Sequence, residues 1–312
     1  MPARARVIID NDFAGDPDGL FQLAHHVLCT SVEVVQVIAS RVPDAMVAPG
    51  QDFIADGVAA ANEVLELACS PLRAVPGSPT ALGHDETPRS SPTVETLIRE
   101  AMREDTGAPL YFAAGAGLTA LAMAYSIEPR IAKRLTLVWI GGNGYEHEAP
   151  GLEFNTSSDL LAAQIVFQSP IPIWQVPEST YGQCLVSWAE LDRDIAPLGA
   201  LGSHLVERWR SFNHFVEGRF GASLGECAVL GDSPLVLLTA LQGTFHQDPS
   251  SSPSQLLPRR PILDSGAYGA PTDGLPPVRV FTAVDMRLMY GDLVAKLAAR
   301  HVTLPQPADS TH

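Results

Sequence analysis

The beginning of the sequence reads Val7-Ile8-Ile9-Asp10-Asn11-Asp12-Phe13-Ala14-Gly15-Asp16-Pro17-Asp18-Gly19. Its first three residues are apolar and β-branched, which is typical of a buried strand. The apolar residues that follow recur at helical spacing: Leu20, Phe21, Leu23, Ala24, Val27 and Leu28. A group of carboxylates therefore lies where a strand ends and a helix begins. In an open α/β sheet, ligands bind at this edge, beyond the carboxyl ends of the strands.

The four carboxylates of this stretch are Asp10, Asp12, Asp16 and Asp18. At such short spacing they repel one another and raise one another's pKa unless a cation neutralises them. Carboxylate oxygens are hard ligands that suit Mg²⁺ or Ca²⁺, so the stretch predicts a metal site. In a purely structural alternative, Asp16 caps the helix and Pro17 takes its first position. That alternative accounts for only one of the four acids.

The rest of the chain alternates between strand and helix patterns. Apolar runs predict strands at 32–40, 72–75, 110–114, 135–140, 171–176 and 278–284. Helical periodicity is found at 51–69, 93–104, 118–126, 157–168, 234–242 and 290–300. This alternation predicts an α/β fold with a mostly parallel central sheet and helices on both faces.

We expect a single domain over residues 1–312, because the sequence has no internal repeat and no clear linker. Residues 1–12 would form the opening strand and the first part of the metal site. Residues 185–230 read as a helical insertion on the substrate side. Residues 248–277 are rich in Pro, Ser and Gly and read as a loop or hairpin excursion.

Composition excludes several classes of function. The formal net charge of −15 argues against binding to nucleic acid or to anionic membranes. The four cysteines form no CxxC pair, which argues against zinc and redox motifs and favours free thiols in a reducing compartment. No apolar run reaches transmembrane length and the N-terminus has no signal-peptide pattern. We therefore predict a cytoplasmic protein.

Further motifs follow the opening acids in a recognisable order. They are GxGLTxLA at 115–122, Gly141-Gly142 after a strand, Glu153-Phe154-Asn155 before a helix, and Asp-x-Pro at Asp232. With the opening Asp10-x-Asp12-x-x-x-Asp16, this set resembles the inosine–uridine nucleoside hydrolase family. The resemblance implies calcium-dependent hydrolysis of the N-glycosidic bond of a ribonucleoside or related ribosyl compound, by a homodimer or homotetramer.

The resemblance also implies a set of metal ligands. Asp12 would bind Ca²⁺ and activate a water molecule, and Asp232 and a backbone carbonyl at Ala114 or Gly115 would be further ligands. The family has two adjacent aspartates where this chain has Asp16-Pro17-Asp18. With a one-residue insertion, which we prefer, Asp18 is the ligand and Asp16 binds ribose; without it, Pro17 falls at the ligand position.

The remaining predicted site residues contact the substrate or support the ligands. Glu153 and Asn155 match residues that hold ribose hydroxyls in the family. The other predicted substrate contacts are Asp16, Asn11, Ser40 and Asn143, and Asp10 is expected to lie behind the metal ligands.

This chain departs from the family at the position of the leaving-group acid. The family often has a His directly before the late Asp, where this chain has Gly231. His147 stands where the family has an Asn, and Ser40 stands where the family has a ribose-binding Asn. A loop His has a pKa near neutrality, so His147 is our candidate for the acid; the alternative is a surface His or one that only tethers the loop.

Two other functions remain open from the sequence. The altered acid pair and the missing His are compatible with a catalytically silent homologue that binds a ribosyl ligand. A Mg²⁺-dependent phosphatase with a DxD nucleophile is disfavoured, because Phe13 follows Asp12 and both lysines, Lys133 and Lys296, lack a phosphate-binding context. Aromatic candidates for stacking on a base are Tyr145, Tyr181 and Trp209.

Overall fold

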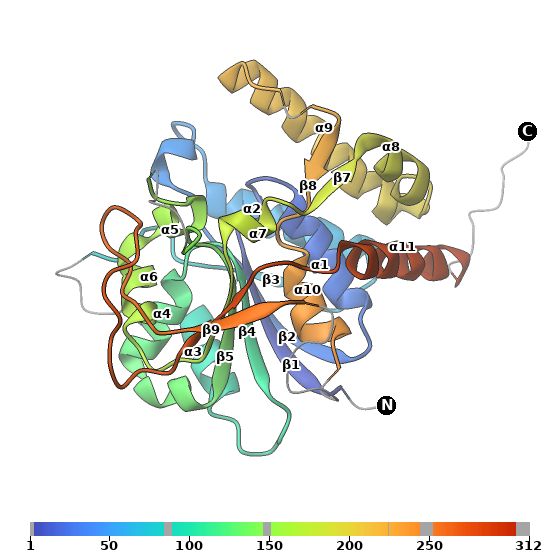
Figure 1. The fold of residues 1–312 in the computed structure, drawn as a ribbon. Helices are drawn as coiled ribbons and strands as arrows, with labels where there is room; N and C mark the ends of the chain where they lie inside the picture. The colour runs from blue at the N-terminus through green and yellow to red at the C-terminus, as the bar shows by residue number, and fades with distance from the viewer. Residues whose placement is uncertain (1–2, 84–88, 146–150, 224, 244–251, 304–312) are drawn as a thin grey trace, which may run out of the picture.

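The computed structural model describes residues 3–83, 89–145, 151–223, 225–243 and 252–303. An eight-stranded sheet with the order β3-β2-β1-β4-β5-β6-β10-β9 lies at its centre (Figure 1). Its pairings are parallel except for β9, which is antiparallel to β10. The predicted mostly parallel α/β fold is therefore confirmed. The strands are β1 Ala5–Asn11, β2 Val32–Ala39, β3 Ala74–Pro76, β4 Leu110–Gly115, β5 Leu135–Ile140, β6 Ile173–Val176, β9 Ser254–Leu257 and β10 Val278–Phe281.

Helices cover both faces of this sheet (Figure 1). One face carries α1 Asp18–Leu28, α2 Phe53–Leu67, α10 Pro234–Val236, the π-helical turn η4 Leu237–Leu241 and α11 Met286–Thr303. The other face carries α3 Pro92–Ala101, α4 Thr119–Ile127 and α6 Leu160–Phe167. Val7 and Ile9 of β1 belong to the first core and Ile8 to the second. This is the period-2 alternation of a strand that is buried on both faces.

The chain reverses its direction across the sheet between β1 and β4. β1 pairs with β2 on one side and with β4 on the other, and Asn11 lies opposite Gly115 where both strands end. The connections after these two strands therefore leave in different directions and open a crevice at their carboxyl ends. The predicted acid cluster lies at this crevice.

Residues 185–230 form a unit at the carboxyl edge of the sheet, from which α9 extends (Figure 1). It consists of β7 Leu185–Ser187, α8 Trp188–Glu190, η3 Leu191–Ile195, α9 Gly199–Phe220 and β8 Cys227–Val229. β7 pairs antiparallel with β8. The sequence pattern predicted helix from residue 185, and this is wrong at 185–187 because the strand there depends on a partner about forty residues away.

A second difference lies at residues 154–168, where the sequence predicted one helix over 157–168. The structure has α5 Phe154–Ser158 and α6, separated at Asp159, whose backbone is extended at φ −158°. The carboxylate of Asp159 accepts a hydrogen bond from the Ala162 amide at 3.0 Å and caps α6.

The remaining short elements connect the larger ones. They are η1 Asp44–Met46, η2 Pro129–Lys133 and α7 Glu178–Tyr181. Among the described residues, no helix combines the length and apolar character needed to cross a bilayer.

Candidate active site

A cavity of about 480 Å³ opens at the carboxyl ends of β1 and β4. Four carboxylates line one side of it: Asp12, Asp16, Asp18 and Asp232. We call these four residues the acidic floor. Asp12 directly follows β1, Asp16 lies in the next turn, Asp18 begins α1 and Asp232 precedes α10. The fold thus brings Asp232 to the acids of the opening stretch.

The turn between β1 and α1 places the first three acids. The amide of Gly15 donates to the carbonyl oxygen of Asp12 at 2.6 Å, which closes a tight turn directly after the strand. Pro17 is the N-cap residue of α1, and the helix begins at Asp18 without a side-chain cap. Asp16 therefore does not cap α1, and the purely structural explanation for this acid is wrong.

Asn11 links the acids to one another. Its side-chain oxygen accepts a hydrogen bond from the Asp12 amide at 2.8 Å, and its side-chain nitrogen donates to Asp232 at 2.8 Å. The amide of Asp232 donates to Asp18 at 3.0 Å. At Gly115 a Cβ atom would lie 2.4 Å from a carboxylate oxygen of Asp232, so a glycine is required for this close approach.

Buried polar groups of α1 support Asn11 from behind. Gln22 accepts a weak hydrogen bond from Asn11 at 3.4 Å and is hydrogen-bonded to Nδ1 of His26. His26 Nε2 lies 2.8 Å from the Thr239 hydroxyl, which itself donates to the carbonyl oxygen of Leu235 at 2.7 Å. Because the hydroxyl proton is already used, His26 Nε2 must donate and Nδ1 must accept. This arrangement requires a neutral imidazole, and burial lowers the pKa of His26 to about 3.

Burial dominates the electrostatics of the acidic floor. It raises the pKa of Asp12 and of Asp18 well above the usual range, and the neighbouring carboxylates of Asp16 and Asp232 raise both pKa values further. Burial and the charge of Asp16 raise the pKa of Asp232 to about 8. Behind the floor, burial raises the pKa of Asp10 to about 7, opposed by a hydrogen bond from Ser40. Such a cluster needs either protons or a cation to compensate its charge.

The donor set of the floor fits a hard divalent cation. Carboxylate oxygens together with a backbone carbonyl at the end of β4 are the ligands that Ca²⁺ and Mg²⁺ prefer. Among the described residues, no three carboxylates bring one oxygen each within 4.8 Å of one another. Simultaneous binding of one ion by three of these carboxylates therefore requires at least one of them to move.

Of the other predicted contacts, Asn155 lines the cavity. Its side-chain nitrogen donates to the carbonyl oxygen of Ile140 at 2.9 Å, and its side-chain oxygen accepts no hydrogen bond from the described residues. Ser40 donates to Asp10, and Asn143 donates to the carbonyl oxygens of Gly151 and Gly266 at 3.0 and 3.1 Å. These two side chains, like Asn11, lie behind the cavity wall rather than in it. His147 lies outside the described residues.

Glu153 also lies behind the wall, almost fully buried. Its carboxylate accepts hydrogen bonds from the amides of Gly142 and Thr156, from the Thr156 hydroxyl, and from the amide of Asn155 at 3.0 Å. The hydroxyl of Tyr181 donates to it at 2.8 Å. Glu153 therefore holds Asn155 and Tyr181, both of which face the cavity.

Position 231 has little room for a side chain. A Cβ atom there would lie 3.1 Å from a carboxylate oxygen of Asp18 and 3.2 Å from the ring of Tyr181. Both contacts are tighter than ordinary van der Waals separation. The ring of Tyr181 thus lies against the position where the family often has its His.

The far wall of the cavity was missed from the sequence. It is formed by α9, which presents Arg208, Phe212, Phe215 and Arg219 to the cavity. Of the aromatic candidates, only Tyr181 lines the cavity; Tyr145 stacks on Tyr268 at 4.0 Å between ring centroids, and Trp209 is buried in the core. The spacing i, i+4, i+7, i+11 on α9 was the signal that could have found this wall.

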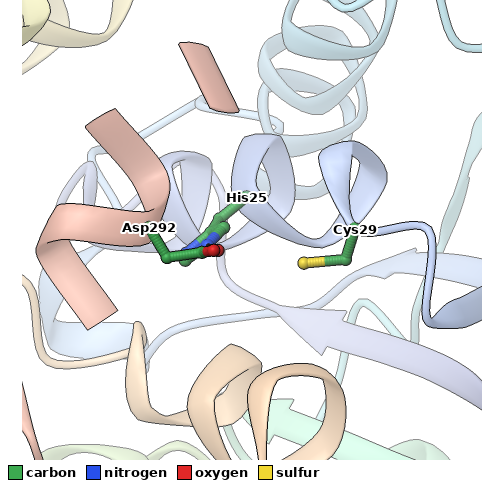
Figure 2. A group of neighbouring side chains, drawn as sticks. All are labelled: His25, Cys29 and Asp292. Atoms are coloured by element: carbon green, nitrogen blue, oxygen red, sulfur yellow. The ribbon is translucent and has the colours of Figure 1, made fainter. Parts of the chain in front are cut away.

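A second cluster of ligand-type side chains lies between α1 and α11. His25, Cys29 and Asp292 place their ligand atoms within 4.8 Å of one another (Figure 2). His25 Nε2 is 2.8 Å from Asp292, and Lys296 donates to Cys29 at 3.2 Å and also to Asp292. The ammonium group of Lys296 thus already provides the positive charge that a metal ion would supply. We interpret this cluster as a packing contact between the two helices.

Comparison with known proteins places the whole chain in one family. The family model described as "Inosine-uridine preferring nucleoside hydrolase" matches residues 7–298. The chain belongs to this family. The resemblance noted from the sequence is confirmed, and so is the prediction of a glycosyl hydrolase of the nucleoside hydrolase family. No match is found among the curated proteins compared.

Solved structures of nucleoside hydrolases share the fold at low sequence identity. A plant nucleoside hydrolase superposes with a TM-score of 0.71 at 19% identity, covering 95% of this chain and 99% of the other. A purine-preferring ribonucleoside hydrolase from Gardnerella vaginalis gives 0.71 at 15% identity with the same coverage of both chains. An inosine-guanosine nucleoside hydrolase gives 0.73 at 16% identity, again covering 95% and 99%. These likenesses support the fold and leave the choice of substrate open.

Proposed function

We propose that this member of the family is a calcium-dependent hydrolase of the N-glycosidic bond of a ribonucleoside or related ribosyl compound. The observation that carries the proposal is the acidic floor, in which the buried carboxylates of Asp12, Asp18 and Asp232 and the half-buried Asp16 meet at the carboxyl ends of β1 and β4. Their raised pKa values mark a cluster whose charge is compensated best by a divalent cation. The proposed reaction assigns no catalytic role to a lysine side chain.

The residues that would hold the ion are Asp12, Asp18, Asp232 and the backbone carbonyl of Gly115. When bound there, Ca²⁺ lowers the pKa of water and offers open coordination positions to hydroxyl groups of ribose. The hydrogen bond from the Asp232 amide to Asp18 supports assigning Asp18 rather than Asp16 to the ion. Asp16 then remains for a ribose hydroxyl.

The protein groups named here act on the ribose side of the bond that is cleaved, at the attacking water and at the ribose hydroxyls. Asp12 accepts a proton from the attacking water as a general base. Asp16 and the free side-chain oxygen of Asn155 accept hydrogen bonds from ribose hydroxyls. The transition state of glycosyl transfer resembles an oxocarbenium ion, so the negative floor stabilises its developing positive charge.

The supporting residues act through these groups. We propose that Glu153 orients Asn155 and Tyr181, that Asn11 orients Asp12 and Asp232, and that Asp10 and Ser40 hold the end of β1 from behind. Direct contact of Glu153, Asn11, Ser40 or Asn143 with ribose stays a prediction. So does the role of His147 as the acid for the leaving group.

The leaving group is expected to differ from that of the common inosine–uridine type, because Gly231 supplies no acid. Burial and the adjacent charge of Glu153 raise the pKa of Tyr181, so its hydroxyl stays protonated. That proton is donated to Glu153. We therefore expect a base that departs without strong protonation, or protonation by His147.

A reducing-sugar assay tests the proposal. The purified protein would be assayed on purine, pyrimidine and modified ribonucleosides, with and without chelator, beside Asp12→Asn. We expect the variant to lose about 10²- to 10⁴-fold in kcat, the usual contribution of a general base. Asp105→Asn is the matched control, because Asp105 lies before β4 at the opposite end of the strand from the floor. Cleavage that resists both chelator and Asp12→Asn would contradict the proposal.

We also propose a cytoplasmic enzyme that assembles as a homodimer or homotetramer. All four cysteines are free thiols, which suits a reducing compartment. Light scattering coupled to gel filtration measures the assembly, and a monomer at micromolar concentration would contradict that part of the proposal.

A further inference from the structure

The cavity has a second wall whose chemistry is opposite to that of the floor. Four side chains of α9 face the cavity at helical spacing: Arg208, Phe212, Phe215 and Arg219. Residues three, four, seven and eleven positions apart share one side of a helix. We call this set the α9 face. It places two cations and two aromatic rings opposite four carboxylates.

The two arginines of the α9 face lack internal partners. Arg208 and Arg219 form no hydrogen bond and no ion pair with any of the residues that the structure describes. Arg210, two residues after Arg208 on the same helix, behaves differently: it pairs with Glu207 and with Asp192. The chain has a net charge of −15, so acidic side chains that could pair with an arginine are abundant. Arg208 and Arg219 nevertheless pair with none of the described ones, and an internal ion pair therefore does not explain their position in the cavity.

Arg208 and Arg219 occupy different depths. Arg208 is half-buried and Arg219 is exposed, and eleven residues of helix separate them by about 16 Å along the axis. Phe212 and Phe215 lie between them, Phe212 half-buried and Phe215 about half exposed. From the inside outward, the face therefore offers a guanidinium, two rings and a second guanidinium.

On this basis, and resting on the proposed hydrolase function, we propose that the substrate is an anionic ribosyl compound whose phosphate or carboxylate group binds Arg208. A guanidinium forms paired, charge-assisted hydrogen bonds with both kinds of group. The phenylalanine rings suit the flat face of a base. The acidic floor repels an anion, so the two walls together orient the compound with its ribose toward the floor and its anionic group toward α9.

The anionic group has two possible positions on such a compound. It is either a phosphate on the 5′ oxygen of ribose or a carboxylate on the base. A carboxylate is planar and a phosphate is tetrahedral, but each can accept two hydrogen bonds from a guanidinium through a pair of oxygens. Uridine, uridine 5′-monophosphate and orotidine are probes that separate these positions, since each anionic compound differs from uridine by a single group.

The experiment compares Arg208→Gln with Arg210→Gln, its paired neighbour on the same helix. For each protein, kcat/KM is measured on the three probes, and calorimetry gives Kd for any probe that is not cleaved. We expect wild type to favour at least one anionic probe over uridine by about tenfold or more, the effect of one charge-assisted contact. Arg208→Gln should abolish this preference, Arg208→Glu should reverse it, and Arg210→Gln should keep it.

The outcomes separate this inference from the proposed function. If uridine is cleaved and both anionic probes are worse, the inference is overturned while the proposed function stands. If nothing is cleaved but an anionic probe binds tenfold more tightly than uridine in an Arg208-dependent manner, the inferred recognition of an anion stands, and the proposed function fails if the wider nucleoside panel is not cleaved either. Equal effects of Arg208→Gln and Arg210→Gln on the preference would also overturn the inference.

Discussion

The floor and the α9 face of the same cavity are built in opposite ways. The floor consists of carboxylates, three of them buried and Asp16 half-buried, and is held by hydrogen bonds with Asn11 and between Asp232 and Asp18. The α9 face is partly exposed, cationic and aromatic, and its arginines are unpaired within the described chain. The floor has the properties of a chemical site whose groups are positioned by hydrogen bonds behind them. The α9 face has the properties of a surface that selects which substrate binds in the cavity.

This difference separates two sets of measurable quantities. Changes to the floor or its support should alter metal affinity and turnover. Changes to the α9 face should alter KM and the ranking of substrates while metal affinity stays constant. A floor variant that changes only KM, or an α9-face variant that changes metal affinity, would contradict this distinction.

Among variants that keep every carboxylate of the floor, the largest effect is expected from Gly115→Ala. The new methyl group would lie 2.4 Å from Asp232 and displace that carboxylate. We expect Ca²⁺ affinity to fall about 10- to 100-fold, as when groups that orient metal ligands are disturbed. Calorimetry measures this loss. Gly107→Ala, where an added Cβ meets no atom within 4 Å, should leave the affinity unchanged, and equal affinity in both variants would show that Asp232 is not a ligand.

A second prediction concerns the buried support of the floor and its dependence on pH. The pKa of His26 is near 3 in the folded protein and about 6.5 in an unfolded chain. Protonation in acid therefore favours the unfolded state: the stabilising contribution is complete above pH 6.5 and is lost as the pH falls toward 3. Between pH 7 and pH 5, this site should lower the free energy of unfolding by about 2 kcal/mol.

Chemical denaturation of wild type and His26→Gln at the two pH values checks this expectation. The variant should lose less stability on acidification than wild type by about the same 2 kcal/mol. His214→Gln changes an exposed histidine of α9 and should follow wild type. If His26→Gln also follows wild type, the neutral hydrogen-bonded arrangement of His26 is wrong.

The smallest effect is expected at the α9 face. Phe215→Ala removes a half-exposed ring from the cavity wall and should raise KM by about tenfold or less, the value of one aromatic contact with a base. Phe220→Ala removes a similarly exposed ring from the same helix that does not line the cavity. A fall in Ca²⁺ affinity in Phe215→Ala, or equal KM values in the two variants, would contradict the division between floor and face.

The same division explains what could be predicted from the sequence. Asp12, Asp16 and Asp18 follow a buried strand directly, and strand ends of a parallel sheet meet at one edge. Local pattern therefore placed them correctly at the edge of the sheet where the cavity opens. Asp232 and Asn155 were assigned through the family resemblance, because nothing local links them to the opening stretch. In the structure both residues line the same cavity as Asp12, Asp16 and Asp18.

The α9 wall escaped prediction because its residues match an ordinary amphipathic helix. Where α9 lies depends on the pairing of β7 with β8, a contact between three-residue strands that local periodicity does not reveal. Glu153 illustrates a second difficulty. A motif identifies the residue, but only the packed structure shows that its carboxylate already accepts hydrogen bonds from Asn155, Tyr181 and their neighbours.

Calcium titration by calorimetry is the most direct test of the account, because the acidic floor is its centre. Protein freed of metal by chelator would be titrated beside Asp232→Asn and the distant control Asp105→Asn. The account predicts that wild type and Asp105→Asn bind a single Ca²⁺ per chain and release protons on binding, and that Asp232→Asn does not bind measurably. Absence of binding in wild type, or equal binding by Asp232→Asn, would contradict the central claim that these carboxylates form a metal site.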